Sequence, residues 1–226
     1  MIDINKIYNE DCLETLKKIP DNFIDLVITS PPYNMRTRIR NGQYTTREKS
    51  EHFSKKYKFF DDALPINEFY EFHKKVISEL LRTSKIICYN FQIVTGSKEA
   101  FFRIIGDFNK DIKDIIIWDK GHGQPAMHER ILNSCYEFIL ILEGDKKCGR
   151  MIQNAVFKRG EMNNILRISR NKQKDKSHNA VFPFMGSGTT AIVAISNNRK
   201  YIGSEIIKEY FEMAEYKISK TRNGNE

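Results

Sequence analysis

A strand-like run that ends in two consecutive prolines constrains this chain more than any other feature. Residues 23–28 (FIDLVI) are apolar, rich in β-branched side chains and of strand length. Thr29-Ser30-Pro31-Pro32-Tyr33 follows directly. Prolines fix their own φ angles, lack an N–H and hold the preceding residue extended, so this segment predicts a rigid turn at the carboxyl end of a strand. In an open α/β sheet, ligands bind at that edge.

The Pro-Pro turn has the groups needed to hold a planar heterocycle. Ser30 and Pro31 offer oxygen acceptors for an exocyclic amino group, and the ring of Tyr33 can stack on the face of the heterocycle. The simpler alternative is a loop that only closes the strand. Residues 119–125 (DKGHGQP) are expected to form a second turn after another strand, and this turn is a candidate for the far wall of the same pocket.

A glycine-rich segment near the C-terminus predicts a second binding region. Residues 184–190 (FMGSGTT) precede a helix-like run; the two glycines allow close backbone approach to a ligand, and the two threonines can cap the helix. A short strand then ends at Glu205, 17 positions after Gly188. This is near the spacing of about 20 residues at which an acid meets a ribose in nucleotide-binding folds. The lack of a third glycine argues against a pyrophosphate ligand.

Length, charge and cysteine content limit the class of protein. The 226 residues suit one α/β domain, and the net charge of +8 favours a polyanionic partner, although charge alone is weak support. The first residues lack the apolar core of a signal peptide, and no apolar run has membrane-spanning length. The four cysteines show no C-x-x-C spacing. We therefore expect a cytoplasmic protein with reduced thiols, no membrane association and no metal site.

Two basic stretches are candidates for phosphate contacts. Residues 34–60 carry eight Lys or Arg against two Glu, with interleaved aromatic residues and little periodicity. They predict a long mobile loop that clamps phosphates, with a solvated disordered insertion as the alternative. Residues 167–178 form a second basic segment, which is otherwise an ordinary solvated loop. The expected DNA contacts are Arg36, Arg38, Arg40, Lys55, Lys56, Arg170 and Lys172.

Taken together, these motifs resemble the amino-group DNA methyltransferases, which use S-adenosylmethionine to methylate cytosine N4 or adenine N6. Residues 29–34 (TSPPYN) are similar to the catalytic motif of that family, residues 184–190 to its cofactor loop, and residues 177–183 (SHNAVFP) to its His-x-Ala-x-Phe-Pro segment. The catalytic motif comes first, as in the permuted β-type arrangement. The resemblance covers most of the chain. It implies a single domain over 1–226 with a Rossmann-like α/β fold: a mostly parallel twisted sheet with helices on both faces.

The resemblance also implies residue roles. Ser30, Pro31, Pro32 and Tyr33 would hold a flipped base, whose amine attacks the sulfonium methyl without a strong general base. Ser at the first motif position favours cytosine N4 over adenine N6. The expected cofactor contacts are Asp11 near the adenine (otherwise a plain helix N-cap), Glu205 on the ribose, and Phe184, Gly186, Ser187, Gly188, Thr189 and Thr190. The implied partners are double-stranded DNA and a cognate restriction endonuclease, with monomer and homodimer both open.

The chain departs from the family just before the cofactor loop. Relatives have a helix and a separate strand ending in Asp-Pro-Phe there, whereas Pro183 runs directly into Phe184 and Phe182 stands where the acid would be. A strand of about 5–6 residues with a helical crossover does not fit in this space. A real deletion here predicts loss of the central cofactor strand and weak cofactor binding. The alternative is a stretch that this sequence omits, in which case cofactor binding would be ordinary. The alternative functions are therefore a catalytically impaired DNA-binding remnant and, less favoured, a methyltransferase for protein or RNA amides.

Overall fold

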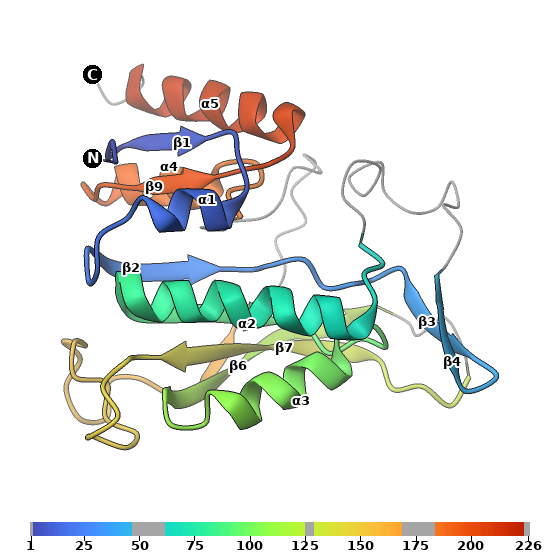
Figure 1. Cartoon of the computed structure of the whole chain (residues 1–226). Coiled ribbons are helices and arrows are strands. Elements are labelled where there is room, and N and C mark those ends of the chain that lie inside the picture. Colours follow the sequence, from blue (N-terminus) through green and yellow to red (C-terminus); the bar gives the residue numbers. More distant parts are fainter. Residues whose placement is uncertain (1, 47–61, 125–128, 169–183, 224–226) are drawn as a thin grey trace.

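The computed structural model of this chain describes residues 2–46, 62–124, 129–168 and 184–223. No helix in these ranges is long and apolar enough to cross a bilayer. The elements, in chain order, are β1 (Lys6–Tyr8), α1 (Cys12–Lys17), β2 (Ile24–Thr29), β3 (Thr37–Arg40), β4 (Gln43–Thr46), α2 (Ile66–Thr83), β5 (Ser84–Phe91), α3 (Lys98–Asp107), β6 (Ile112–Gln124), β7 (Ser134–Leu142), β8 (Ile165–Arg167), α4 (Thr189–Ser196), β9 (Ile202–Ser204) and α5 (Lys208–Asn223) (Figure 1).

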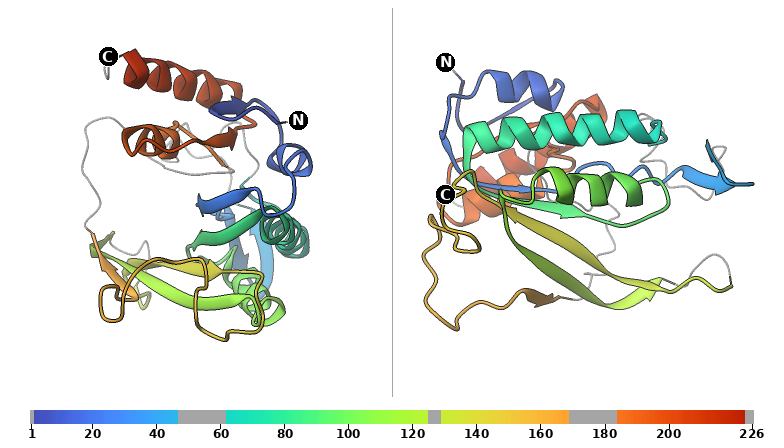
Figure 2. Two further views of the ribbon diagram at one scale, coloured as in Figure 1. Left: turned by 90° about the vertical axis from the view of Figure 1, so that its left-hand side faces the viewer. Right: turned by 60° about the horizontal axis from the view of Figure 1, so that its bottom comes forward.

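The predicted α/β class is confirmed, with a mixed main sheet. Five strands lie in the order β2-β5-β7-β6-β8, in which β2 is parallel to β5 and β6 to β8, while β7 runs antiparallel to both of its neighbours. β1 and β9 form a separate parallel pair. Helices α1, α2 and α3 lie along one side of the strands and α4 and α5 along the other (Figure 2). The structure thus has helices on both sides, as the sequence predicts.

Helix α2 is the main support of the sheet. Its buried face consists of apolar side chains at helical spacing together with one histidine, His73. This face packs into a core that includes Val27 of β2 and Ile87 and Tyr89 of β5, all fully buried. Each large apolar side chain buried in this way contributes about 1.5–3 kcal/mol. α2 therefore fixes β2 and β5 against each other and sets where their carboxyl ends lie.

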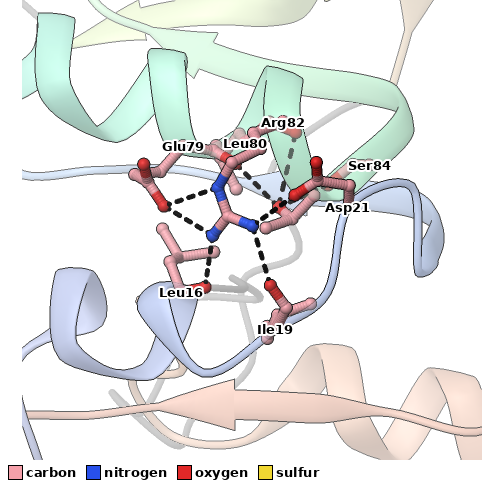
Figure 3. Close-up of polar contacts among 8 residues, drawn as sticks. Leu16, Ile19, Asp21, Glu79, Leu80, Arg82 and Ser84 are labelled. Atoms are coloured by element: carbon pink, nitrogen blue, oxygen red, sulfur yellow. Dashed lines mark hydrogen bonds and ion pairs between the residues drawn. The ribbon is translucent and has the colours of Figure 1, made fainter.

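A single arginine at the end of α2 ties the first helix to this support (Figure 3). The guanidinium of Arg82 donates to the backbone carbonyls of Leu16 and Ile19, both at 2.9 Å. These carbonyls belong to the last turn of α1 and the residues after it, where the regular i→i−4 hydrogen bonds of the helix end. The same group pairs with Asp21 and Glu79, both at 2.7 Å. Arg82 thus fixes the chain just before it enters β2.

The first basic stretch contains regular structure, which corrects the expectation of an aperiodic loop. β3 and β4 form an antiparallel hairpin that extends away from the end of β2 (Figure 1). Asn41 and Gly42 connect its strands with φ values of 51° and 75°. Two positive φ angles define a type I′ turn, which favours Asn-Gly. The rest of this stretch, with Lys55 and Lys56, lies outside the described residues, as do Arg170 and Lys172 of the second basic segment.

The described strands leave an open edge in the middle of the fold. Among them, β2 pairs only with β5, and β9 pairs only with β1. Leu26 and Ile28 of β2 are 50% and 47% exposed, although parallel strands normally have both faces covered. Figure 2 shows the β1–β9 pair standing apart from the five-stranded sheet. Loss of a central strand would leave this break; the Pro183 junction and Phe182 themselves lie outside the described residues.

Candidate active site

The Pro-Pro turn lies where the sequence places it, at the carboxyl end of β2. Thr29, the last residue of that strand, is opposite Tyr89 of β5. The hydroxyl groups of Ser30 and Tyr33 share a hydrogen bond. Asn90, which follows Tyr89 on β5, donates from Nδ2 to the Tyr33 hydroxyl at 2.8 Å. The turn and the neighbouring strand therefore form one polar cluster at the edge where α/β sheets bind ligands.

A buried ion pair lies next to this cluster. Glu137 of β7 accepts from Asn90 Nδ2 at 2.8 Å through one carboxylate oxygen, and its other oxygen is 3.0 Å from the ammonium of Lys120 on β6. The two side chains are only 4% and 3% exposed. The sequence reasoning missed Asn90 and Glu137, and it placed Lys120 only within a turn that could form the far wall of the pocket. Lys120 was expected in a turn, but β6 continues to Gln124 and carries it into the sheet; a lone acid within the apolar run of β7 was the signal for Glu137.

The chain immediately after the turn is held by one asparagine. Asn34 has a left-handed backbone with φ of 57°, and its side chain donates to the carbonyls of Leu64 at 2.9 Å and Gly96 at 3.0 Å. A Cβ atom at Gly96 would lie 2.2 Å from the Asn34 carbonyl oxygen, so only glycine fits there. These contacts fix the exit of the turn between the loops that precede α2 and α3.

His73 of α2 lies between β5 and the Pro-Pro turn. It is fully buried on α2, and its Nδ1 lies 2.6 Å from the Tyr89 hydroxyl. Burial lowers the pKa of His73 to about 3, although the backbone of Pro32 acts in the opposite direction. The imidazole is therefore neutral at physiological pH. We assign His73 a structural role, since it joins α2, β5 and the Pro-Pro turn.

The predicted cofactor residues Gly186 and Glu205 are brought together. The Glu205 carboxylate, just after β9, accepts hydrogen bonds from the backbone N–H of Gly186 at 2.8 Å and of Ile207 at 2.9 Å. Burial raises the pKa of Glu205, and these backbone donors partly offset the effect. A carboxylate has about four acceptor sites, so acceptor capacity remains beyond these backbone donors. This capacity fits the hydroxyl donors of a ribose. Asn9, which the sequence reasoning missed, holds the Glu205 carbonyl at 2.7 Å.

The glycine-rich loop begins helix α4 differently from the prediction. Gly188 is itself the N-cap, with φ of 84° and no side-chain capping bond, so Thr189 and Thr190 are not the caps. A Cβ at Gly188 would come within 3.0 Å of Ala214 on α5, which explains the need for glycine. The hydroxyl of Thr190 is buried with no hydrogen-bond partner among the described residues. The loop thus retains a polar group beyond those its own packing uses.

The two motifs meet on α2. Phe184, at the start of the cofactor loop, packs against Phe72 with ring centroids 5.9 Å apart. Phe72 is adjacent to His73, which contacts the Pro-Pro turn. Asp11 behaves as its simpler interpretation predicts: it caps α1 by accepting from the Leu13 N–H at 2.7 Å. Its contact with the cofactor adenine stays a prediction.

Three of the predicted DNA contacts lie on β3 or immediately before it, in the chain that follows the turn. Arg38 and Arg40 belong to β3, and Arg36 directly precedes it, anchored through its backbone N–H to the Asp62 carbonyl at 3.0 Å. Arg40 is exposed, whereas Arg36 and Arg38 are half-buried. The hairpin therefore places a positive group next to the Pro-Pro turn. No cluster of three or more metal-ligating side chains occurs in the described part of the chain.

Comparison with known proteins gives a consistent result. A family model described as a DNA methylase, for N6 and N4 methyltransferases, matches residues 24–183 and 162–216. The type II methyltransferase M.BglII of Bacillus subtilis is 27% identical over 266 aligned positions, covering 93% of this chain and 68% of the relative. That alignment is longer than this 226-residue chain, so the relative has residues with no counterpart here.

Solved structures share the fold. The cytosine-N4-specific PvuII DNA methyltransferase superposes with a TM-score of 0.62 at 17% identity, covering 98% of this chain and 92% of that one. M1.HpyAVI, solved as a complex with S-adenosylmethionine, superposes with a TM-score of 0.53 at 20% identity, covering 94% and 98%. At these identities the likeness concerns the fold.

Proposed function

This chain belongs to the DNA methylase family of N6/N4 methyltransferases, and from that premise we propose that it transfers a methyl group from S-adenosylmethionine to an exocyclic amino group of a base flipped out of double-stranded DNA. One observation carries the proposal. The Ser30–Tyr33 turn lies at the carboxyl end of β2, in a polar cluster with Asn90, and packs on the same helix as the glycine-rich loop.

The chemistry requires positioning more than acid–base catalysis. The lone pair of a base amine is delocalised into the ring, so the amine is a poor nucleophile. Acceptors at Ser30 and at the Pro31 carbonyl hold its N–H bonds and favour a pyramidal nitrogen, while Tyr33 stacks on the ring. The proline backbone and the hydrogen bonds of the Asn34 side chain to the Leu64 and Gly96 carbonyls fix these groups before the base arrives. S-adenosylmethionine, when bound, supplies an electrophilic methyl group.

Residues of the second region would hold the cofactor. Glu205 has acceptor capacity left for a ribose hydroxyl, and the Gly186–Gly188 loop allows close backbone approach. Phe184, Ser187, Thr189 and Thr190 line the same loop. We place the adenine near Asp11 by the family resemblance.

The target base and the DNA contacts follow from the same reasoning. Ser at the first motif position favours cytosine N4 over adenine N6. The hairpin arginines Arg36, Arg38 and Arg40 would contact phosphates, joined by Lys55, Lys56, Arg170 and Lys172. A cognate restriction endonuclease and the choice between monomer and homodimer stay predictions.

The test is product analysis. Purified protein is incubated with S-adenosylmethionine and enzymatically amplified, unmethylated genomic DNA, which contains every short recognition sequence. The DNA is then digested to nucleosides and analysed by mass spectrometry. We expect N4-methylcytosine. N6-methyladenine alone would contradict the base preference but retain the activity, and neither product would contradict the activity.

A second candidate, an impaired DNA-binding remnant, is favoured by a different observation. Among the described strands, none joins β2 to β9, so the cofactor region lacks support from the main sheet. Calorimetric titration with S-adenosylmethionine separates the two functions. DNA binding without detectable cofactor binding or methylated product would establish the remnant.

A further inference from the structure

We infer that Asn90 is an additional base-contacting residue, whose Oδ1 accepts a hydrogen bond from the exocyclic amino group, and that the buried Glu137–Lys120 pair holds it in that orientation. The inference rests on the proposed function and identifies a substrate contact in the same site. The two polar atoms of the Asn90 side chain, Nδ2 and Oδ1, have very different surroundings.

Both strong donor directions of the Asn90 amide are in use. Nδ2 donates to the Tyr33 hydroxyl and to Glu137 Oε2, each at 2.8 Å; Ser30 Oγ lies farther away at 3.4 Å. Oδ1 is buried and has no hydrogen-bond partner among the described residues. A buried amide oxygen without a donor is unfavourable. The cluster therefore has an acceptor without a donor next to the turn that receives the base, and a base amine can reach it once the side chains that cover it move apart.

The assignment of oxygen and nitrogen in this amide follows from its neighbours. An ionised carboxylate only accepts hydrogen bonds, so rotating the Asn90 amide by 180° would put Oδ1 against Glu137 and leave two acceptors facing each other. Glu137 thus selects the orientation that leaves Oδ1 available. Lys120 balances the charge of Glu137 at 3.0 Å in a site from which water is nearly excluded. These two are positioning residues.

The vacant acceptor complements Ser30. The Ser30 hydroxyl shares a hydrogen bond with Tyr33 and keeps acceptor capacity for the base. An exocyclic amine has two N–H donors, and methyl transfer requires both to be held while the lone pair points at the methyl group. Asn90 Oδ1 would add an acceptor to those of Ser30 and the Pro31 carbonyl, and acceptors held in place in this way accelerate transfer.

The first test replaces the amide by an apolar group of the same shape. Asn90→Leu is compared with Cys88→Ala, a control two residues earlier on the same face of β5. Initial methylation rates on the amplified DNA, cofactor Kd and thermal unfolding midpoint are measured for both. We expect Asn90→Leu to lower kcat about 100-fold with the cofactor Kd essentially unchanged, and the control to behave as wild type.

A second variant keeps the inference testable if the leucine destabilises the protein. Asn90→Asp places a carboxyl group next to Glu137, with Tyr33 and Lys120 as the other titratable neighbours. Its protonated form can donate to Glu137 and keep a carbonyl acceptor for the base, whereas its ionised form cannot donate. Because Glu137 disfavours ionisation, we expect activity close to wild type at the acidic end of the stable range and a loss as pH rises. Wild type lacks this loss.

The outcomes separate the inference from the function. If the wild type is active and Asn90→Leu is equally active, the role of Asn90 is overturned but the proposed function is not. The same conclusion follows if the wild type is active and Asn90→Asp has the pH profile of the wild type. Wild type that binds cofactor and DNA but forms no methylated base overturns the proposed function, and the inference with it. Loss of kcat in Asn90→Leu together with the acid-dependent activity of Asn90→Asp supports the inference.

Discussion

The base side and the cofactor side of the candidate site differ in how many strands support them. On the base side, four adjacent strands of one sheet each contribute: β2 leads into the turn, and β5, β7 and β6 supply Asn90, Glu137 and Lys120. On the cofactor side, Glu205 and the glycine-rich loop depend on the short β1–β9 pair. Groups held by neighbouring strands are fixed by the sheet itself, whereas a loop on a two-stranded pair has little to restrain it. The base pocket is thus the preorganised half.

The substitution with the largest expected effect disrupts the base side alone. Tyr33→Ala removes the stacking surface for the flipped base, and base–aromatic stacking contributes about 1–3 kcal/mol. We expect methylation to fall up to about 100-fold while the calorimetric Kd for S-adenosylmethionine stays the same. Tyr33→Phe keeps the ring but removes the hydroxyl that contacts Ser30 and Asn90, so it separates stacking from those hydrogen bonds. Equal losses in methylation and cofactor binding would show that the two halves are not separable.

The converse experiment breaks the cofactor side alone. Glu205→Gln removes a charged acceptor, and a hydrogen bond to a charged group contributes about 1.5–3 kcal/mol. We expect the Kd for S-adenosylmethionine to rise about 10–100-fold, with near-normal kcat once the cofactor is saturating. Glu209→Gln, on the first turn of α5, is the control. A lower kcat at saturation would place Glu205 in the transfer step itself.

His73 tests how firmly the base side is supported. Its folded-state pKa of about 3 lies below the ordinary value of 6.5, so the unfolded chain binds a proton that the folded chain rejects. The stabilisation is complete above pH 6.5 and declines as pH falls toward 3. The free energy of unfolding should drop by about 2 kcal/mol from this group between pH 6.5 and 5. Denaturant unfolding at both pH values measures it, and His73→Gln should remove most of the slope. An unchanged slope in that variant would exclude His73 as its source.

The smallest effect concerns the hairpin beside the turn. Arg40 is the most exposed of its three arginines, so its substitution leaves the fold intact. Arg40→Gln should weaken all DNA sequences alike and reduce the slope of log K against log salt by about one unit. Fluorescence anisotropy with two unrelated duplexes over a salt series gives both quantities. Weakening confined to one sequence would mean that Arg40 reads bases.

The sequence was most informative where local backbone chemistry decides the structure. Two prolines after a β-branched run placed the Pro-Pro turn, and the family prediction built on it is confirmed. The Asn41-Gly42 pair carried an equally direct hairpin signal, yet the high charge around it was interpreted as a loop. The capping role given to Thr189 and Thr190 was wrong because Gly188 adopts the left-handed conformation that begins α4.

The rest of the site could not be predicted because it depends on register between distant strands. Glu137 is a lone acid in the apolar run of β7, whereas Asn90 and Lys120 are polar residues among others in β5 and β6, and no local pattern shows that the three meet. They meet because β7 lies between β5 and β6 and is antiparallel to both. In this register Glu137 of β7 is opposite Trp118 of β6, two positions from Lys120. A shift of one residue in that register would turn each side chain to the other face of the sheet.

The buried Lys120–Glu137 pair also restricts how this protein can change over generations. Losing either partner alone leaves an isolated charge in a site that is almost dry, at a cost of about 3–5 kcal/mol. That is a large part of the 5–15 kcal/mol by which a typical domain is stable. Replacing both with apolar residues would be tolerable for folding, but each single step toward it passes through a destabilised intermediate. Homologous proteins should therefore keep both residues or replace both. A homologue that keeps only one of them should carry a compensating substitution nearby.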